Sequence, residues 1–223
     1  MISHCESGEP SVSRSISETL CANLSRGIHA AAQPLSILRA SLGNPYLDRM
    51  SEEELRELAT NSALEVERVC TLFSCLRRLV SAESIEPKLL PAPILPLLAY
   101  AVDGVKLLFD EDGMFLRSMG PNTCPPILID RKRTLEALSS ILLVAHAVSR
   151  SQDTVEVITS SPSTSTVRIV TRNLHSQLEA LNTEQSLSMA LAEANIRSQQ
   201  GSFTWSMQPF NVQIDLQRMQ LEH

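Results

Sequence analysis

The chain has 223 residues, of which 43% are hydrophobic and 20% charged, and its formal net charge is −6. This length suits one large domain or two small ones, and the composition predicts a chain that folds and stays in solution. The acidic balance and the lack of a basic block make nucleic acid a poor partner, because phosphate binding needs clustered Lys and Arg.

Neither a membrane span nor a secretory signal is expected. No run of about 18 apolar residues occurs, and the start, MISHCESGEPSVSRS, lacks an apolar core segment. The five cysteines have no metal-like CxxC spacing and are expected to be free thiols in a reducing cytoplasm. We expect residues 1–14 to be a frayed tail, and we exclude residues 221–223, Leu-Glu-His, as the remnant of a purification tag.

Two long amphipathic helices are predicted within residues 15–84, because apolar residues recur there every three or four positions. The first series is Ile16, Leu20, Leu24, Ile28, Ala31, Leu35, Leu38 and Leu42, and the second is Leu55, Leu58, Ser62, Val66, Val69, Phe73, Leu76 and Val80. Gly43-Asn44-Pro45 ends the first helix, and Ser51 with Glu54 has the spacing of a capping box for the second. The short connection predicts an antiparallel hairpin. Two chains that pair into a four-helix bundle would cover both apolar stripes.

The first helix contains a histidine and, five residues later, a proline, in the stretch GIHAAAQPLSIL. Because Ile28 is assigned to the buried stripe, His29, about 100° further around the helix, is expected to face solvent. Pro34 removes a backbone hydrogen bond and is expected to bend or loosen the helix one turn beyond His29. By itself, a lone histidine at such a position is more often an idle surface residue than a functional one.

Mixed helices and strands follow a proline-rich segment, residues 85–96, that is predicted to be a linker. Helices are expected at 94–103, 131–149 and 183–199. Extended segments are expected at 105–109, 114–118, 127–130, 154–159 and 166–171, and a last strand pair follows Gly201. Strands with helices on one face predict an α/β sandwich over residues 97–220, and the whole chain is therefore predicted to be α+β.

The His-x-x-x-x-Pro pattern of HAAAQPL, placed in a helical hairpin ahead of an α/β segment, resembles the phospho-acceptor box of bacterial sensor histidine kinases. The order of elements after residue 96 resembles their ATP-binding domain, and the resemblance extends over about residues 15–218. It implies a dimerisation hairpin that becomes a four-helix bundle, followed by a histidine-kinase-like ATPase domain.

The sequence departs from that family at the residues that handle nucleotide. Val144 stands where the family has a magnesium-binding asparagine, with Ser140 at the companion position, and Arg172-Asn173-Leu174-His175 stands where an adenine-reading aspartate and glycines are found. An aliphatic side chain cannot bind a hard cation, and no glycine lies between Gly120 and Gly201 to form a phosphate lid. Arg131, Lys132 and Arg133 are interpreted as a solvated first helical turn. In the hairpin, Ala30 replaces the acidic residue that follows the family's histidine.

These departures make the chain more similar to the dimeric histidine phosphotransferases of the ChpT-like type, which keep a degenerate ATPase domain. That resemblance implies a cytoplasmic phosphorelay component in two-component signal transduction. His29 is then the phospho-acceptor, Gln33 a possible auxiliary residue, Arg26 and Arg39 partner contacts, and Pro34 a structural residue. The implied partners are a second copy of the chain and response-regulator receiver domains, including that of a hybrid kinase. No cofactor or metal is expected in the chain itself, because the receiver supplies magnesium.

Two other functions stay open at this point. A pseudo-histidine-kinase dimer could act as a non-catalytic binding or regulatory module, which the loss of the acid at Ala30 favours. An active ATP-dependent kinase is disfavoured by the missing glycines and by Val144.

Overall fold

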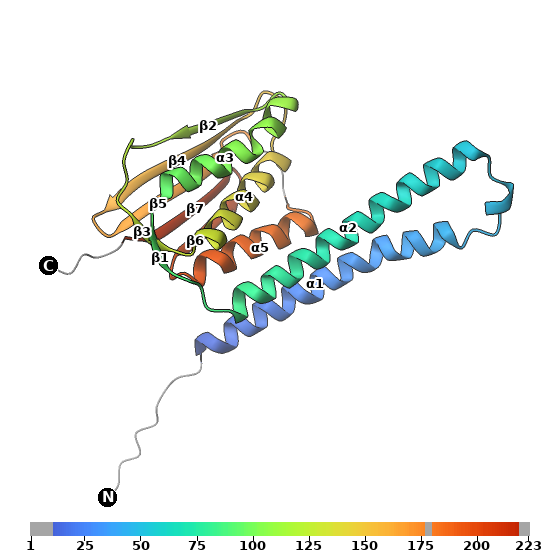
Figure 1. Cartoon of the computed structure of the whole chain (residues 1–223), viewed down its shortest axis with the longest axis horizontal. Coiled ribbons are helices and arrows are strands. Elements are labelled where there is room, and N and C mark those ends of the chain that lie inside the picture. The colour runs from blue at the N-terminus through green and yellow to red at the C-terminus, as the bar shows by residue number, and fades with distance from the viewer. Residues whose placement is uncertain (1–10, 177–179, 219–223) are drawn as a thin grey trace, which may run out of the picture. The chain divides into compact units, whose positions relative to one another are not determined.

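The computed structural model describes residues 11–176 and 180–218, with side chains from residue 18 onward. It confirms the α+β class: a pair of long helices precedes a mixed sheet with its own helices (Figure 1). The chain divides into two units, Met1–Leu76 and Arg77–His223, which we describe separately. Of the predicted segments, most of the frayed tail and the tag remnant lie outside the described residues. Cys5 and the side chain of Ile16 also lie outside them.

The first unit is the predicted helical hairpin. It consists of α1 (Ser11–Leu42), the short 3₁₀ helix η1 (Leu47–Arg49) and most of α2 (Glu52–Ser84). Ser51 and Glu54 form the predicted capping box, since the Ser51 N–H donates to Glu54 Oε2 at 2.7 Å and the Glu54 N–H donates to Ser51 Oγ at 3.3 Å. Hydrogen bonds from the Ser51 N–H and hydroxyl lower the pKa of the Glu54 carboxyl.

Small residues form the seam between α1 and α2. Asn23, Gly27, Ala31 and Pro34 are buried on α1, at a spacing of three or four residues that places them on one side of the helix. Gly27 lies against the side chain of Leu76 so closely that a Cβ at this position would overlap it. The absence of a side chain at Gly27 therefore permits close approach of the two helices.

Ile28, Leu35 and Leu42, which are predicted to be covered when two chains pair, are exposed in the single chain. Ile28 is 59% exposed, Leu35 47% and Leu42 58%. On α2, Leu72 and Leu76 are buried while Val66 and Phe73 are each 50% exposed. The apolar stripe on each helix is wider than one helix–helix contact can cover. The two helices pack along the edge of the α1 stripe that carries small residues, because this edge allows the closest packing.

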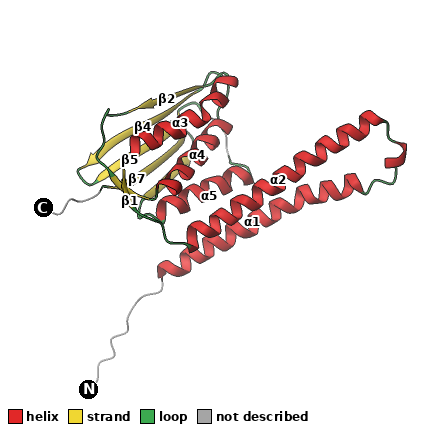
Figure 2. Ribbon diagram, viewed as in Figure 1, coloured by secondary structure: helices red, strands yellow, loops and turns green. Residues whose placement is uncertain are grey.

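In the described residues of the second unit, the elements form one five-stranded sheet, a two-stranded sheet and three complete helices. Its elements are β1 (Leu90–Ala92), α3 (Ile94–Glu111), β2 (Phe115–Met119), β3 (Ile127–Ile129), α4 (Arg131–Ala147), β4 (Thr154–Ser163), β5 (Thr166–Asn173), α5 (Thr183–Arg197), β6 (Ser202–Met207) and β7 (Phe210–Gln217). The large sheet has the order β2-β4-β5-β7-β6, with β2 parallel to β4 and the other pairs antiparallel. The three helices cover one of its faces (Figure 2).

Two local predictions differ from the structure. Residues 105–109, expected to be a strand, continue α3, because Ala101, Val105 and Phe109 extend its buried stripe at a spacing of four. The segment 85–96, expected to be a linker, contains β1, whose Leu90 and Ala92 pair with β3. α3 then begins at Ile94. A short apolar segment can form either a helix or a strand. Which one it forms depends on whether a partner strand is available for it to pair with.

The core of this unit lies between the helices and the sheet. Along β5, Val167, Ile169 and Thr171 are buried, as expected of alternate side chains on the covered face. The uncovered face carries ion pairs between strands: Arg168 Nε lies 2.7 Å from Asp215 Oδ1. This contact lowers the pKa of the Asp215 carboxyl.

The last turns of α2 are attached to α4 and α5 by charged side chains. Glu136 on α4 accepts from Arg78 Nε at 2.5 Å and from Asn195 Nδ2 on α5 at 2.7 Å. Arg133 donates to the Ala82 carbonyl at 2.9 Å, to the Ile85 carbonyl, and to Ser198 Oγ at 2.8 Å. A guanidinium group thus satisfies the Ala82 carbonyl in the last turn of α2, where carbonyls lack helical donors.

Asp130 joins the start of α4 to the segment before β1. Its carboxylate accepts from the N–H groups of Lys132 and Arg133, and from the Lys88 N–H at 3.0 Å. Burial alone raises the pKa of Asp130, but these backbone hydrogen bonds and the nearby Arg133 guanidinium outweigh it and lower the pKa below its ordinary 3.8.

Among the described cysteines, Cys21, Cys70 and Cys124 are free thiols. Among the helices of residues 11–176 and 180–218, none combines the length and apolarity that a bilayer crossing needs.

We expect Gly27→Leu to destabilise the hairpin by about 1–3 kcal/mol, because the new side chain must displace Leu76 from the seam. Urea unfolding followed by circular dichroism measures the change. Ala40→Leu, on the exposed side of α1, controls for a leucine added to this helix. Equal stabilities of the two variants would contradict the close-approach role of Gly27.

Replacement of Asp130 by Asn should reduce stability at pH 7 by about 1 kcal/mol, because the charged acceptor of three N–H groups is lost. A lowered folded-state pKa contributes stability that is present above the unfolded value and lost as pH falls. The difference between wild type and variant should therefore shrink as pH falls below 3.8. Unfolding at a series of pH values tests this, with Asp103→Asn, an exposed position on α3, as the control for removal of one carboxylate.

Candidate phosphoryl-transfer site

His29 lies on the exposed side of α1. At 100° per residue it points about 160° away from the seam that contains Gly27 and Ala31. No side chain within the described part of the chain forms a hydrogen bond or ion pair with its ring. The imidazole is thus open to an approaching molecule, as the sequence predicted.

The predicted companions of His29 are also exposed. Gln33 lies one helical turn further along on the same side. Arg26, one turn before, donates to Asn23 Oδ1 at 3.4 Å, a contact that leaves most of its guanidinium group available. Arg39 is exposed about 80° around the helix from His29. The structure thus groups Arg26 and Gln33 with His29 and places Arg39 toward one flank.

Pro34 has a different place from His29. It is buried in the seam, within a helix that continues to Leu42. Because proline has no N–H, the carbonyl of Ala30 lacks its usual helical donor. This carbonyl belongs to the residue directly after the histidine, so the proline affects backbone hydrogen bonding beside His29 rather than the shape of the exposed surface.

The surroundings of His29 offer no carboxylate along its helix. Positions three and four away are Ser25, Arg26, Ala32 and Gln33, and the next residue is Ala30. A general base must lie within hydrogen-bond reach of the proton that it takes. The α1 positions next to His29 and one turn from it therefore place no carboxylate beside its ring.

In the second unit, the two positions that the sequence resemblance matched to a magnesium site lie in the core or at its edge. Val144 is 3% exposed and packs among the buried residues of α4, and Ser140 is half-buried. Within residues 11–176 and 180–218, no three His, Cys, Asp or Glu side chains gather to hold a metal ion. An aliphatic side chain at this point supplies no oxygen ligand.

The end of β5 corrects the sequence interpretation of Arg172. Arg172 lies on the uncovered face of the sheet, where its Nε is 2.8 Å from Glu156 Oε2. Its neighbour Asn173 is fully buried on the helix-covered side. The period-two alternation of Val167, Ile169 and Thr171 predicts this placement, whereas a match by position after the strand puts Arg172 where the family has its adenine-reading aspartate.

Asn173 has both ends of its carboxamide occupied. Nδ2 donates to Ser149 Oγ at 2.8 Å and to Asp153 Oδ2 at 2.9 Å, while Oδ1 accepts from the His175 N–H at 2.9 Å. Burial alone raises the pKa of Asp153, but the Asn173 hydrogen bond, the Arg150 N–H and nearby positive charge outweigh it and lower the pKa. Asn173 is thus engaged in holding the α4–β4 turn.

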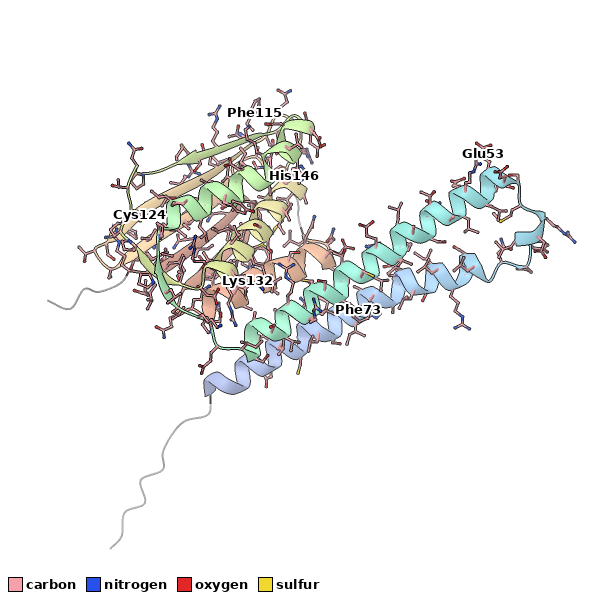
Figure 3. The ribbon with its side chains drawn as sticks, in the orientation of Figure 1. Glu53, Phe73, Phe115, Cys124, Lys132 and His146 are labelled. Carbon is pink, nitrogen blue, oxygen red and sulfur yellow. The ribbon has the colours of Figure 1, made fainter. Side chains whose placement is uncertain are left out.

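Sequence reasoning missed a groove at the start of α4. Arg131 and Lys132, interpreted as solvated charges, line two grooves: one of about 520 Å³ that is surrounded by many charged residues, and an apolar one of about 430 Å³ beside α3. Figure 3 labels Lys132 on this turn. The cations were visible in the sequence, but their neighbour Tyr100 comes from another helix.

No protein-family model matches the sequence, and no curated protein matches it. Solved structures do. The histidine kinase AdeS of Acinetobacter baumannii is similar with a TM-score of 0.68 and 16% identity, over 85% of this chain and 97% of that one. A histidine kinase of Burkholderia phymatum has a TM-score of 0.53 and 17% identity, over 86% and 97%.

The histidine kinase ThkA, solved in complex with the response regulator protein TrrA, has a TM-score of 0.71 at 10% identity, over 92% of this chain and 64% of that one. Identities this low establish the fold alone. The chain therefore has the histidine-kinase-like fold, a helical hairpin followed by an ATPase-like α/β domain.

Proposed function

We propose that this chain is a histidine phosphotransfer protein that relays a phosphoryl group to and from receiver-domain aspartates without using ATP. The main support is the exposed, unpartnered imidazole of His29 on a helical hairpin, in a chain whose matching nucleotide positions are occupied by Val144 and by the fully engaged Asn173. The complex of ThkA with a response regulator supports a receiver domain as the partner.

The proposed step is an exchange of one bond for another. A neutral ring nitrogen of His29 attacks the phosphorus of a phosphoaspartate, the P–N bond forms, and the P–O bond to the carboxylate breaks. The carboxylate leaves with the electron pair, and the reverse step passes the group onward. Magnesium on the receiver offsets the charge of the phosphoryl oxygens. The histidine protein then needs to supply only orientation and a docking surface.

We assign supporting roles to the neighbours of His29. Gln33, one turn away, is placed to donate a hydrogen bond to a phosphoryl oxygen. Arg26 and Arg39 supply positive charge toward an acidic receiver pocket, which favours encounter more than final affinity. Pro34 is a structural residue of the seam.

We also infer that the hairpin pairs with a second copy to form a four-helix bundle. Ile28, Leu35 and Leu42 lie about 60–100° to one side of the α1 seam, and Leu55, Val66 and Phe73 lie about 70–90° from the α2 seam in the same sense. Because the helices are antiparallel, the same sense of rotation brings both sets to one face of the hairpin. His29 is about 120° from this face and stays open when it is covered.

Another function, a non-catalytic binding module with the same fold, is favoured by one observation. Ala30 and the positions a turn from His29 contain no carboxylate. Such a protein binds a receiver without accepting its phosphoryl group, and the experiment below separates the two.

Wild type incubated with receiver domains phosphorylated by acetyl phosphate should gain acid-labile, base-stable phosphate, and His29→Gln should gain none. Glutamine keeps a polar side chain of similar length but lacks the nucleophilic ring. His175→Gln removes another exposed histidine and should still be labelled.

Receiver binding without labelling of wild type would favour the binding module. Measurable affinity for ATP with magnesium, by calorimetry, would contradict the ATP-independent assignment. Labelling of His29→Gln at the wild-type level would exclude His29 as the acceptor.

Ile28→Glu should convert the dimer to monomer, with the dimer Kd weakened at least about a hundredfold, because two buried isoleucines are lost per dimer at about 1.5–3 kcal/mol each. Sedimentation velocity over a concentration series measures this. Leu64→Glu is the matched control, because Leu64 is also 59% exposed but lies on the opposite flank of α2. Wild type that is monomeric at all concentrations would refute the bundle.

A further inference from the structure

The first turn of α4 carries three consecutive cations, Arg131, Lys132 and Arg133. The positive end of the helix dipole disfavours cations at this place. Arg133 has a structural explanation in its hydrogen bonds to the Ala82 carbonyl and Ser198 Oγ. Arg131 and Lys132 have none: both side chains are exposed, and neither forms a hydrogen bond or ion pair with any side chain of the described residues.

An apolar groove of about 430 Å³ adjoins these two cations. Leu97, 7% exposed, lies beside Tyr100, which is 69% exposed, and Pro96 and Leu135 complete the apolar lining. Ligand sites in proteins are typically apolar, hold about 300–1,000 Å³, and carry a few polar groups that fix orientation. Among the described residues that line this groove, Arg131 and Lys132 alone are charged.

The apolar surface continues along α3. Tyr100 and Leu107 are seven residues apart and lie on the same side of the helix, and Leu107 is 68% exposed. Gly104 lies between them in the helix interior, where glycine is destabilising. A Cβ on Gly104 would meet no atom within 4 Å, so packing inside the chain does not require glycine at this position. Because Gly104 has no side chain, nothing projects from this position of α3 beside the groove.

We propose that this groove binds an amphipathic organic anion, with its apolar body against Leu97, Tyr100 and Leu135 and a carboxylate head at Arg131 and Lys132. The positive rim favours an anion and the lining favours an apolar body, so a molecule with both features fits the groove best. A small inorganic anion leaves the apolar wall unused, and a neutral apolar molecule leaves both cations unpaired.

The attraction comes from the side chains rather than from the start of the helix. Asp130 already accepts from the Lys132 and Arg133 N–H groups, so these donors are not free for a ligand. Two cations on adjacent residues can each approach one carboxylate oxygen, and charge-assisted hydrogen bonds of this kind are the stronger ones. This inference does not rest on phosphoryl transfer by His29.

Calorimetric titration of the full chain with decanoate, below its critical micelle concentration, tests the proposal. Wild type should bind decanoate, bind 1-decanol more weakly, and show no affinity for decyltrimethylammonium. Arg131→Glu/Lys132→Glu should weaken decanoate binding at least about tenfold, and Tyr100→Ala should weaken both decanoate and decanol. Higher ionic strength should weaken decanoate binding in wild type, because the rim is exposed.

Arg117→Glu, an exposed cation on β2 outside the groove, is the matched control and should bind decanoate as wild type does. Arg131→Gln/Lys132→Gln provides a milder variant if the double reversal fails to fold. Absence of decanoate binding to wild type up to millimolar concentration overturns the proposal. Equal binding by wild type and a folded groove variant, or tighter binding of decanol than decanoate, overturns it as well.

Discussion

The close contact between α1 and α2 at Gly27 is the constraint on which the hairpin depends. The missing side chain there lets Leu76 lie against the α1 backbone, and the small residue Ala31 extends the same seam. Helices that approach along small residues leave their larger apolar side chains on the flank. His29, two positions beyond Gly27, is carried almost to the opposite side. One steric choice thus determines both the exposed apolar face and the open imidazole.

The second unit has an ATPase-like α/β fold, and its core depends on burial rather than on the groups that a ligand would contact. The layers need only apolar side chains on the covered face of the sheet, and Val144 meets that need better than a polar ligand. Asn173 keeps a polar group in the core, but both ends of its carboxamide are hydrogen-bonded within the fold, to Ser149, Asp153 and the His175 N–H. Fold stability and ligand binding are therefore separable, because the first depends on burial and the second on where unsatisfied polar atoms point.

The three cations of α4 illustrate the same separation within one helical turn. Arg133 reaches the free carbonyls at the end of α2 and takes part in the fold. Arg131 and Lys132 point outward, beside an apolar groove. A substitution of Arg133 thus acts on stability, whereas substitutions of the other two act on the surface. Like charges in one helical turn have different consequences here, because Arg133 reaches Ala82 and Ser198 while Arg131 and Lys132 are exposed beside the groove.

The sequence by itself determined the α+β class, the hairpin, the capping box at Ser51 and most element positions, because these follow from local periodicity and from short-range hydrogen bonds. It did not determine which edge of the apolar stripe forms the seam, whether residues 105–109 are helix or strand, or that Asn173 rather than Arg172 faces the core. Only the tertiary structure decided those points. Each depends on the distance between segments far apart in the chain: Gly27 against Leu76, α3 against the sheet, and β5 against α4. A local pattern does not contain that distance.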